Sequence, residues 1–159
     1  MKAASISELK QELANATQKE LVALCLRLAK YKKENKELLS FLLFEANDLQ
    51  EYINGVKKEI DCLFGEVNKS SLHFAKKTIR KILGITNKHI RYTASKEAEA
   101  ELLIYFCTAF KKSGIKFHKS TALTNLYNAQ IKKINAAIDS LHEDLAYEYK
   151  KQKEALLLL

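Results

Sequence analysis

Basic side chains concentrate in one stretch of this sequence. Residues 67–96 carry eight Lys and Arg side chains and no Asp or Glu, within a chain whose formal net charge is +8. Residues 1–66 hold ten basic and eleven acidic side chains, and residues 97–159 hold nine and eight. The excess positive charge therefore lies in this stretch. The chemistry open to it is anion binding, and the phosphate backbone of nucleic acids is the commonest candidate.

A helix over this stretch would bring its cationic side chains to one face. At about 100° per residue they fall within an arc of about 140°, joined by His73, while the aliphatic side chains fall on the opposite side. We therefore predict, as one hypothesis, sequence-nonspecific nucleic-acid binding through the cationic face of residues 73–91. The candidate binding residues are Lys76, Lys77, Arg80, Lys81, Lys88 and Arg91.

Two other interpretations of this face stay open. A solvated helix face usually mixes charges, because Glu–Lys pairs four residues apart contribute a few tenths of a kcal/mol each. A face of one sign forgoes those pairs. Acidic side chains that follow in the sequence, Glu97, Glu99 and Glu101, would remove the need for a ligand if the fold turned them toward the face. Lysines that are merely solvated are the third interpretation.

Motifs for catalysis and metal binding are few. Asp139-x-x-His142 is the nearest match to the Glu-x-x-His pairs of di-metal helical bundles, which need two such pairs. No Gly-rich phosphate loop, nucleophile elbow or zinc spacing is present. We expect no catalytic residue, no metal, no cofactor and no small-molecule ligand. An enzyme built from groups that converge from distant segments remains an alternative.

The three cysteines and the apolar runs bear on the compartment. Cys25, Cys62 and Cys107 are an odd number and stand among apolar residues, so we expect small buried hydrophobes in a reducing compartment. The apolar runs 38–44 and 102–107 are much shorter than the ~20 residues of a membrane span. The opening residues lack the apolar core of a signal peptide. These features favour a cytoplasmic protein that does not enter the membrane.

Apolar residues recur at helical spacing along the whole chain, and proline is absent. No alternating run demands a strand, so the sequence predicts an all-α fold with a single helical domain over 1–159. We expect about six helices in an antiparallel bundle or a small stack of helical hairpins. Two of them, near residues 39–64 and from residue 121 through Leu145, carry long heptad patterns.

Local signals define several helix ends. Ser5 with Glu8, and Thr17 with Glu20, have the spacing of capping boxes for the first two helices. The second of these is apolar over much of its surface, so we expect it to be buried. Ser95 should cap a helix that is apolar on nearly all sides and therefore central. The aromatic residues expected in the core are Phe41, Phe44, Tyr105, Phe106 and Phe110.

The opening third also resembles a known family. "LKQEL" at 9–13, followed by "KELVALCLRL" at 19–28, is similar to the start of an uncharacterised bacterial all-helical family. The resemblance implies a helical fold and no particular activity. With a packing pattern and no polar catalytic cluster, the leading hypothesis is a non-enzymatic interaction or scaffold protein, which docks a protein partner or itself along a helical face.

Overall fold

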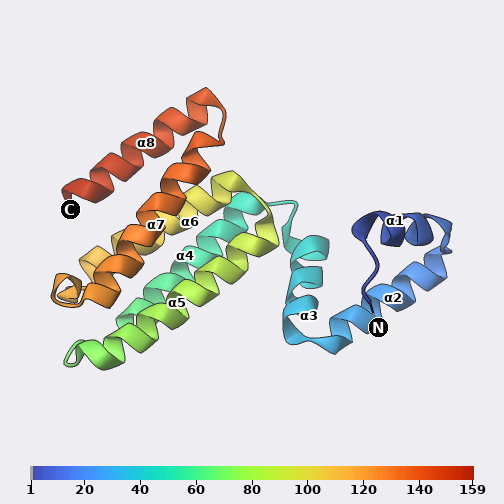
Figure 1. Cartoon of the computed structure of the whole chain (residues 1–159), viewed down its shortest axis with the longest axis horizontal. Helices are drawn as coiled ribbons and strands as arrows, with labels where there is room; N and C mark the ends of the chain where they lie inside the picture. Colours follow the sequence, from blue (N-terminus) through green and yellow to red (C-terminus); the bar gives the residue numbers. More distant parts are fainter. Residues whose placement is uncertain (1) are drawn as a thin grey trace. The chain divides into compact units, whose positions relative to one another are not determined.

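The computed structural model of the chain describes residues 2–159, and these residues form helices and connections without a strand (Figure 1). The all-α prediction is confirmed. Contacts divide the chain into two compact units, Met1–Ala46 and Asn47–Leu159, and each is described by itself. No helix among residues 2–159 combines the length and the apolar character needed to cross a membrane.

The first unit is built from three α-helices and one π-helical turn. The predicted capping boxes are confirmed: the Ser5 backbone N–H donates to Glu8 at 2.7 Å, and the Thr17 N–H donates to Glu20 at 2.8 Å. Each pair thereby satisfies backbone groups that would otherwise lack partners at a helix start. The elements are α1 (Ile6–Asn15), α2 (Gln18–Tyr31), α3 (Lys33–Ser40) and the π-helix η1 (Phe41–Glu45).

Burial in the first unit differs from the expectation. The second helix, α2, was expected to be buried, yet none of its residues is, and Phe41 is the one buried residue among positions 2–46. The physical reason is size, since a unit this short has no second layer of helices to cover its apolar faces. Phe44 is likewise not a core residue, because 78% of its surface is exposed.

The second unit contains the remaining helices. Its core forms around Phe106 and Phe110 of α6, against the ring of Phe64 from α4. The elements are α4 (Leu49–Gly65), α5 (Leu72–Thr93), α6 (Lys96–Lys112), the 3-10 helix η2 (Phe117–Lys119), α7 (Thr121–Asp139) and α8 (Glu143–Leu158).

The structure has eight α-helices among residues 2–159, where the sequence predicted about six. Both long heptad helices are broken. The first stops at Ala46, and Asp48 begins α4 by accepting the Glu51 backbone N–H at 3.0 Å. The last stops at Asp139, and a new helix starts at Glu143. Caps and turns of three residues thus interrupt a hydrophobic period that continues on both sides.

Helix α6 occupies the centre of the second unit, as its apolar character predicted. It contacts α4, α5, α7 and α8, and most of its residues from Ala98 to Phe110 are buried. Ser95 caps it by accepting the Ala98 backbone N–H at 3.2 Å. Of the cysteines, Cys107 is buried here, but Cys25 and Cys62 are exposed, which corrects the expectation for those two.

Candidate interaction surfaces

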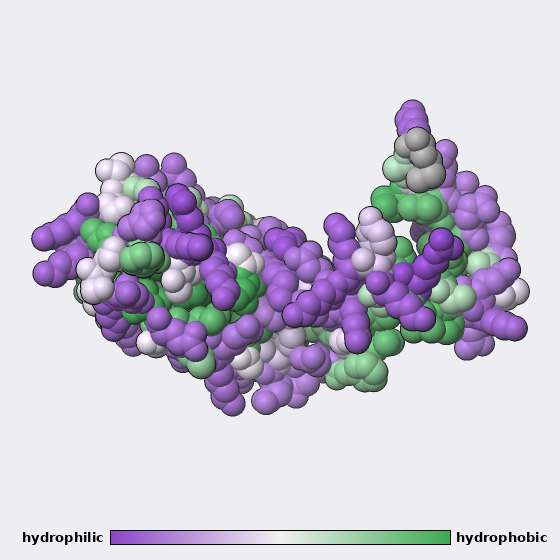
Figure 2. Space-filling model, turned by 90° about the horizontal axis from the view of Figure 1, so that it is seen from below, coloured by the Kyte–Doolittle hydropathy of each residue, from purple (hydrophilic) through white to green (hydrophobic). Residues whose placement is uncertain are grey.

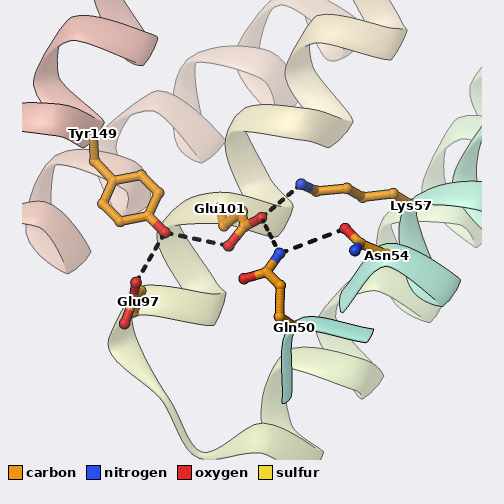
Figure 3. A network of polar contacts seen from close by, with 6 residues as sticks. All are labelled: Gln50, Asn54, Lys57, Glu97, Glu101 and Tyr149. Atoms are coloured by element: carbon orange, nitrogen blue, oxygen red, sulfur yellow. Dashed lines mark hydrogen bonds and ion pairs between the residues drawn. The ribbon is translucent and has the colours of Figure 1, made fainter. Parts of the chain in front are cut away.

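A polar network joins three helices of the second unit (Figure 3). The Glu101 side chain is 12% exposed. It accepts hydrogen bonds from the Lys57 ammonium at 2.6 Å and from the Gln50 amide at 3.2 Å. From α8, the Tyr149 hydroxyl lies 3.2 Å from Glu101 and 3.3 Å from Glu97. Burial raises the pKa of Tyr149, and the two carboxylates raise it further. The phenol therefore stays a neutral donor and links α8 to α6.

This network bears directly on the cationic face, because it holds two of the acids that would have neutralised it. Glu101 and Glu97 bind groups of α4 and α8. The third acid, Glu99, pairs with Lys96 at 2.7 Å. None of the three has an ion pair with Lys76, Lys77, Arg80, Lys81 or Arg91 among the interactions of residues 2–159. These three carboxylates therefore do not neutralise the cationic face.

The cationic face lies along α5, opposite the buried side chains Ala75, Ile79 and Ile82. The side chains of its exposed members make no hydrogen bond, ion pair or ring contact with another described residue, and the half-buried Lys76 likewise has no ion pair with one. These exposed members are Lys77, Arg80, Lys81 and Arg91.

Lys88, the sixth predicted residue, has a different environment. Its side chain is half-buried, and its ammonium lies 6.0 Å from the centre of the Tyr92 ring. An ammonium over an aromatic face is held by the ring quadrupole. All six predicted residues thus lie on α5. Five of them have no ion pair with another described residue, and Lys88 contacts the Tyr92 ring within the fold.

His89 is also engaged within the fold. Its Nδ1 lies 2.6 Å from the Tyr52 hydroxyl of α4, and its Nε2 lies 3.2 Å from a Glu59 carboxylate oxygen. The imidazole is 15% exposed and meets the Tyr92 ring edge-on. These contacts tie α5 to α4. The His89 side chain is thus directed into the fold.

One exposed aromatic side chain on this face was missed in the sequence. Phe74, near the start of α5, is 58% exposed, and its ring meets His73 edge-on at 5.7 Å between centroids. The signal was its spacing, since it precedes Lys77 by three residues and Lys81 by seven, which places the three side chains on one side of a helix.

A second surface belongs to the first unit. Large apolar side chains stand exposed on α1, α2 and η1, and Figure 2 shows hydrophobic residues at the surface of this N-terminal segment, on the right of the view. Exposure reaches 81% for Ile6 and 61% for Leu28. We call this set the apolar surface. Its members are Ile6, Leu9, Leu13, Val22, Leu24, Leu26, Leu28, Leu42, Leu43 and Phe44.

The second unit also has a cavity of about 380 Å³ beside α6 and α8. Lys57 and Glu101 contribute to its lining but are paired with each other, and the Thr108 hydroxyl donates to the Ile104 carbonyl at 2.9 Å. Ala155 and Leu156 complete its apolar side. The Lys57, Glu101 and Thr108 side chains of this lining are thus engaged in contacts within the fold.

Comparisons of this chain with models of protein families, with curated proteins and with solved structures give no match.

Proposed function

We propose that this chain is a non-enzymatic, cytoplasmic interaction protein, in which residues 47–159 form an antiparallel helical scaffold and the first unit docks a protein partner or a second copy. The observation that carries the proposal is the apolar surface. Leu24 and Leu28 lie one turn apart on α2, both exposed, in a unit where Phe41 alone is buried among residues 2–46.

The energetics of that surface favour a partner. Burying one leucine or isoleucine side chain contributes about 1.5–3 kcal/mol, so several of these residues buried together offset the roughly 4–15 kcal/mol that association costs. Large apolar side chains exposed together on one side of a helix are typical of interaction sites, and Leu24 and Leu28 are such a pair on α2. The period of the apolar residues on α1 and α2 is helical, which suits a partner that contributes another helix.

The test replaces Leu24 and Leu28 with Glu in the full chain. Sedimentation velocity over a range of protein concentrations reports self-association, and a photo-reactive amino acid at position 31, which is exposed on the same side of α2 as Leu24 and Leu28, captures a protein partner in the native cell. We expect the double variant to lose the association by at least tenfold, since two buried leucines are removed. The matched control, Gln11→Glu with Gln18→Glu, adds the same charge at exposed polar positions of α1 and α2.

A monomer at every concentration that also captures no protein in the cell would overturn this proposal. So would an association that the Leu24→Glu and Leu28→Glu variant retains. Circular dichroism of both double variants verifies that the helices are intact before the comparison is made.

A second function is favoured by a separate observation, the four exposed cations of α5 without ion pairs. We propose sequence-nonspecific nucleic-acid binding in which these four, Lys77, Arg80, Lys81 and Arg91, contact phosphates, and in which the half-buried Lys76 and Lys88 add positive charge beside them. Cations held without acidic partners are available to release counterions from phosphates, and this is the main source of nonspecific affinity. No base-reading element is required for such binding.

Fluorescence anisotropy with labelled mixed-sequence DNA and RNA tests this second function. Replacing Lys76, Lys77, Arg80 and Lys81 with Glu should abolish binding at low salt. The matched control reverses the same number of charges on α7 and α8, at Lys132, Lys133, Lys150 and Lys151, and should retain most of the affinity. Equal loss in both variants would show that net charge alone is responsible.

A further inference from the structure

We propose that the cationic face binds single-stranded nucleic acid in preference to duplex, with Phe74 as the platform on which one base stacks. The proposal rests on the nucleic-acid function proposed above and names its substrate class. Lys77, Arg80, Lys81 and Arg91 contact the backbone phosphates.

The surroundings of Phe74 set it apart from an ordinary surface phenylalanine. Scattered exposed apolar residues are normal, and exposure alone says little. Phe74, however, is 58% exposed on the face that carries Lys77 and Lys81. Its ring contacts the ring of His73, which is also exposed. An aromatic ring beside unpaired cations is the combination that single-strand binding proteins use.

The dimensions of the face fit a short strand. Seventeen positions separate Phe74 from Arg91, and α5 is one uninterrupted helix over them, which at 1.5 Å per residue is about 25 Å. At about 3.4 Å per nucleotide along a stacked strand, this length matches roughly seven nucleotides. Site sizes of about 4–16 nucleotides are typical of single-strand binding modules.

Base accessibility decides between single strand and duplex. In a duplex the flat faces of the bases are covered by their neighbours, so a ring such as Phe74 meets only edges and backbone. In a single strand the faces are open, and stacking on an aromatic side chain contributes to affinity for every base type. Phe74 should therefore strengthen single-strand binding alone, whereas the cations strengthen both.

An anionic membrane surface is the competing ligand for a cationic face with an aromatic residue. Peripheral binding to membranes scales with the apolar area that enters the lipid. The aliphatic side of α5 is occupied by the protein core, through Ile79 and Ile82, and leaves Phe74 as the large apolar side chain exposed on this helix. A single ring suffices for stacking a base but gives little lipid burial, so the observations favour nucleic acid.

The experiment measures anisotropy with a labelled 20-nucleotide single strand and a 20-base-pair duplex of mixed sequence, at 50 and 200 mM salt. The variants are Phe74→Ala and Phe74→Trp, and Tyr147→Ala is the control, because Tyr147 is 67% exposed on α8. We expect Phe74→Ala to weaken single-strand binding about tenfold and duplex binding less than twofold. With four phosphate contacts, the wild-type affinity for single strands should fall about 50-fold between the two salt concentrations.

The Phe74→Trp variant gives an independent readout. The sequence has no tryptophan, so this variant has a single indole, and its fluorescence should be quenched by the single strand and not by the duplex. Unchanged fluorescence at saturating single strand would contradict stacking, whatever the affinity.

The remaining outcomes separate this inference from the function on which it rests. Equal weakening of both ligands by Phe74→Ala, or of neither, overturns the stacking role while the cationic face still binds nucleic acid. No binding of either ligand at 50 mM salt overturns both. Vesicles with phosphatidylserine serve as the third ligand, and binding to them that exceeds nucleic-acid binding and depends on Phe74 would assign the face to membranes instead.

Discussion

Tyr127 illustrates how a single buried group sets a pH dependence. The residue is 6% exposed, stacks against Phe117 at 5.2 Å, and its hydroxyl has no hydrogen-bond partner among residues 2–159. Burial raises the pKa of Tyr127 to about 12, and the nearby Cys107 adds to the shift. The hydroxyl of the unfolded chain ionises near pH 10. The folded pKa is the higher one, so stability is fully present below about pH 10 and falls as the pH rises toward 12.

We predict that Tyr127→Phe is more stable than the wild type at pH 7 by about 1 kcal/mol, because the substitution removes a buried hydroxyl without a partner. From pH 10 to 11 the variant should also lose less stability, by up to about 1.4 kcal/mol for this one group. Urea unfolding followed by circular dichroism at pH 7, 10 and 11 measures these differences. A variant that is less stable at pH 7 would mean that the hydroxyl is satisfied in solution.

Among the elements, α5 ends in an unusual way. Ala94 follows its last residue with φ +48°, a left-handed conformation that costs a residue with a side chain about 1 kcal/mol relative to glycine. The Ala94 N–H still donates to the Ile90 carbonyl, as expected at a helix C-terminus. Gly114, with φ +75°, takes the comparable position after α6.

The two positions give opposite predictions. Ala94→Gly should raise the free energy of unfolding by about 0.5–1 kcal/mol, and Gly114→Ala should lower it by a similar amount. No atom lies within 4 Å of where a Cβ at Gly114 would be, so the second effect comes from the backbone alone. Thermal and urea unfolding of the two variants beside the wild type measures both. Equal signs would contradict the argument.

The helix ends show which parts of the fold could be predicted from the sequence. The caps at Ser5, Thr17 and Ser95 were predictable because each hydroxyl oxygen accepts from a backbone N–H only three residues further along the chain. The breaks at 46–48 and 140–142 were not, since neither contains Gly or Pro and the apolar period runs through both. Asp48 and Glu51 do have the spacing of a cap, but the heptad pattern outweighed it.

The candidate surfaces were predictable in the same uneven way. The charge of α5 is a local property, so its cationic face could be predicted from the sequence. Whether Glu97 and Glu101 neutralise it depends on groups more than forty residues away, among them Lys57 and Tyr149. The exposure of α2 could not be predicted either, because an apolar helix has the same sequence pattern whether its own chain or a partner covers it.

For the whole molecule, the division into two units makes a prediction about stability. Residues 2–46 contain one buried residue, Phe41, so removing residues 1–46 should change the free energy of unfolding of the remainder by less than about 1–2 kcal/mol. Calorimetry of the full chain and of residues 47–159 compares the melting temperatures. The single domain expected over 1–159 stays a prediction, and a loss of several kcal/mol on truncation would support it instead.

The break at 46–48 joins two units that carry different proposed binding surfaces. Three residues separate the end of η1 from the start of α4. A protein bound to the apolar surface and a nucleic acid bound to α5, as proposed above, would be carried by one chain. The chain would then act as an adaptor that links the two ligands.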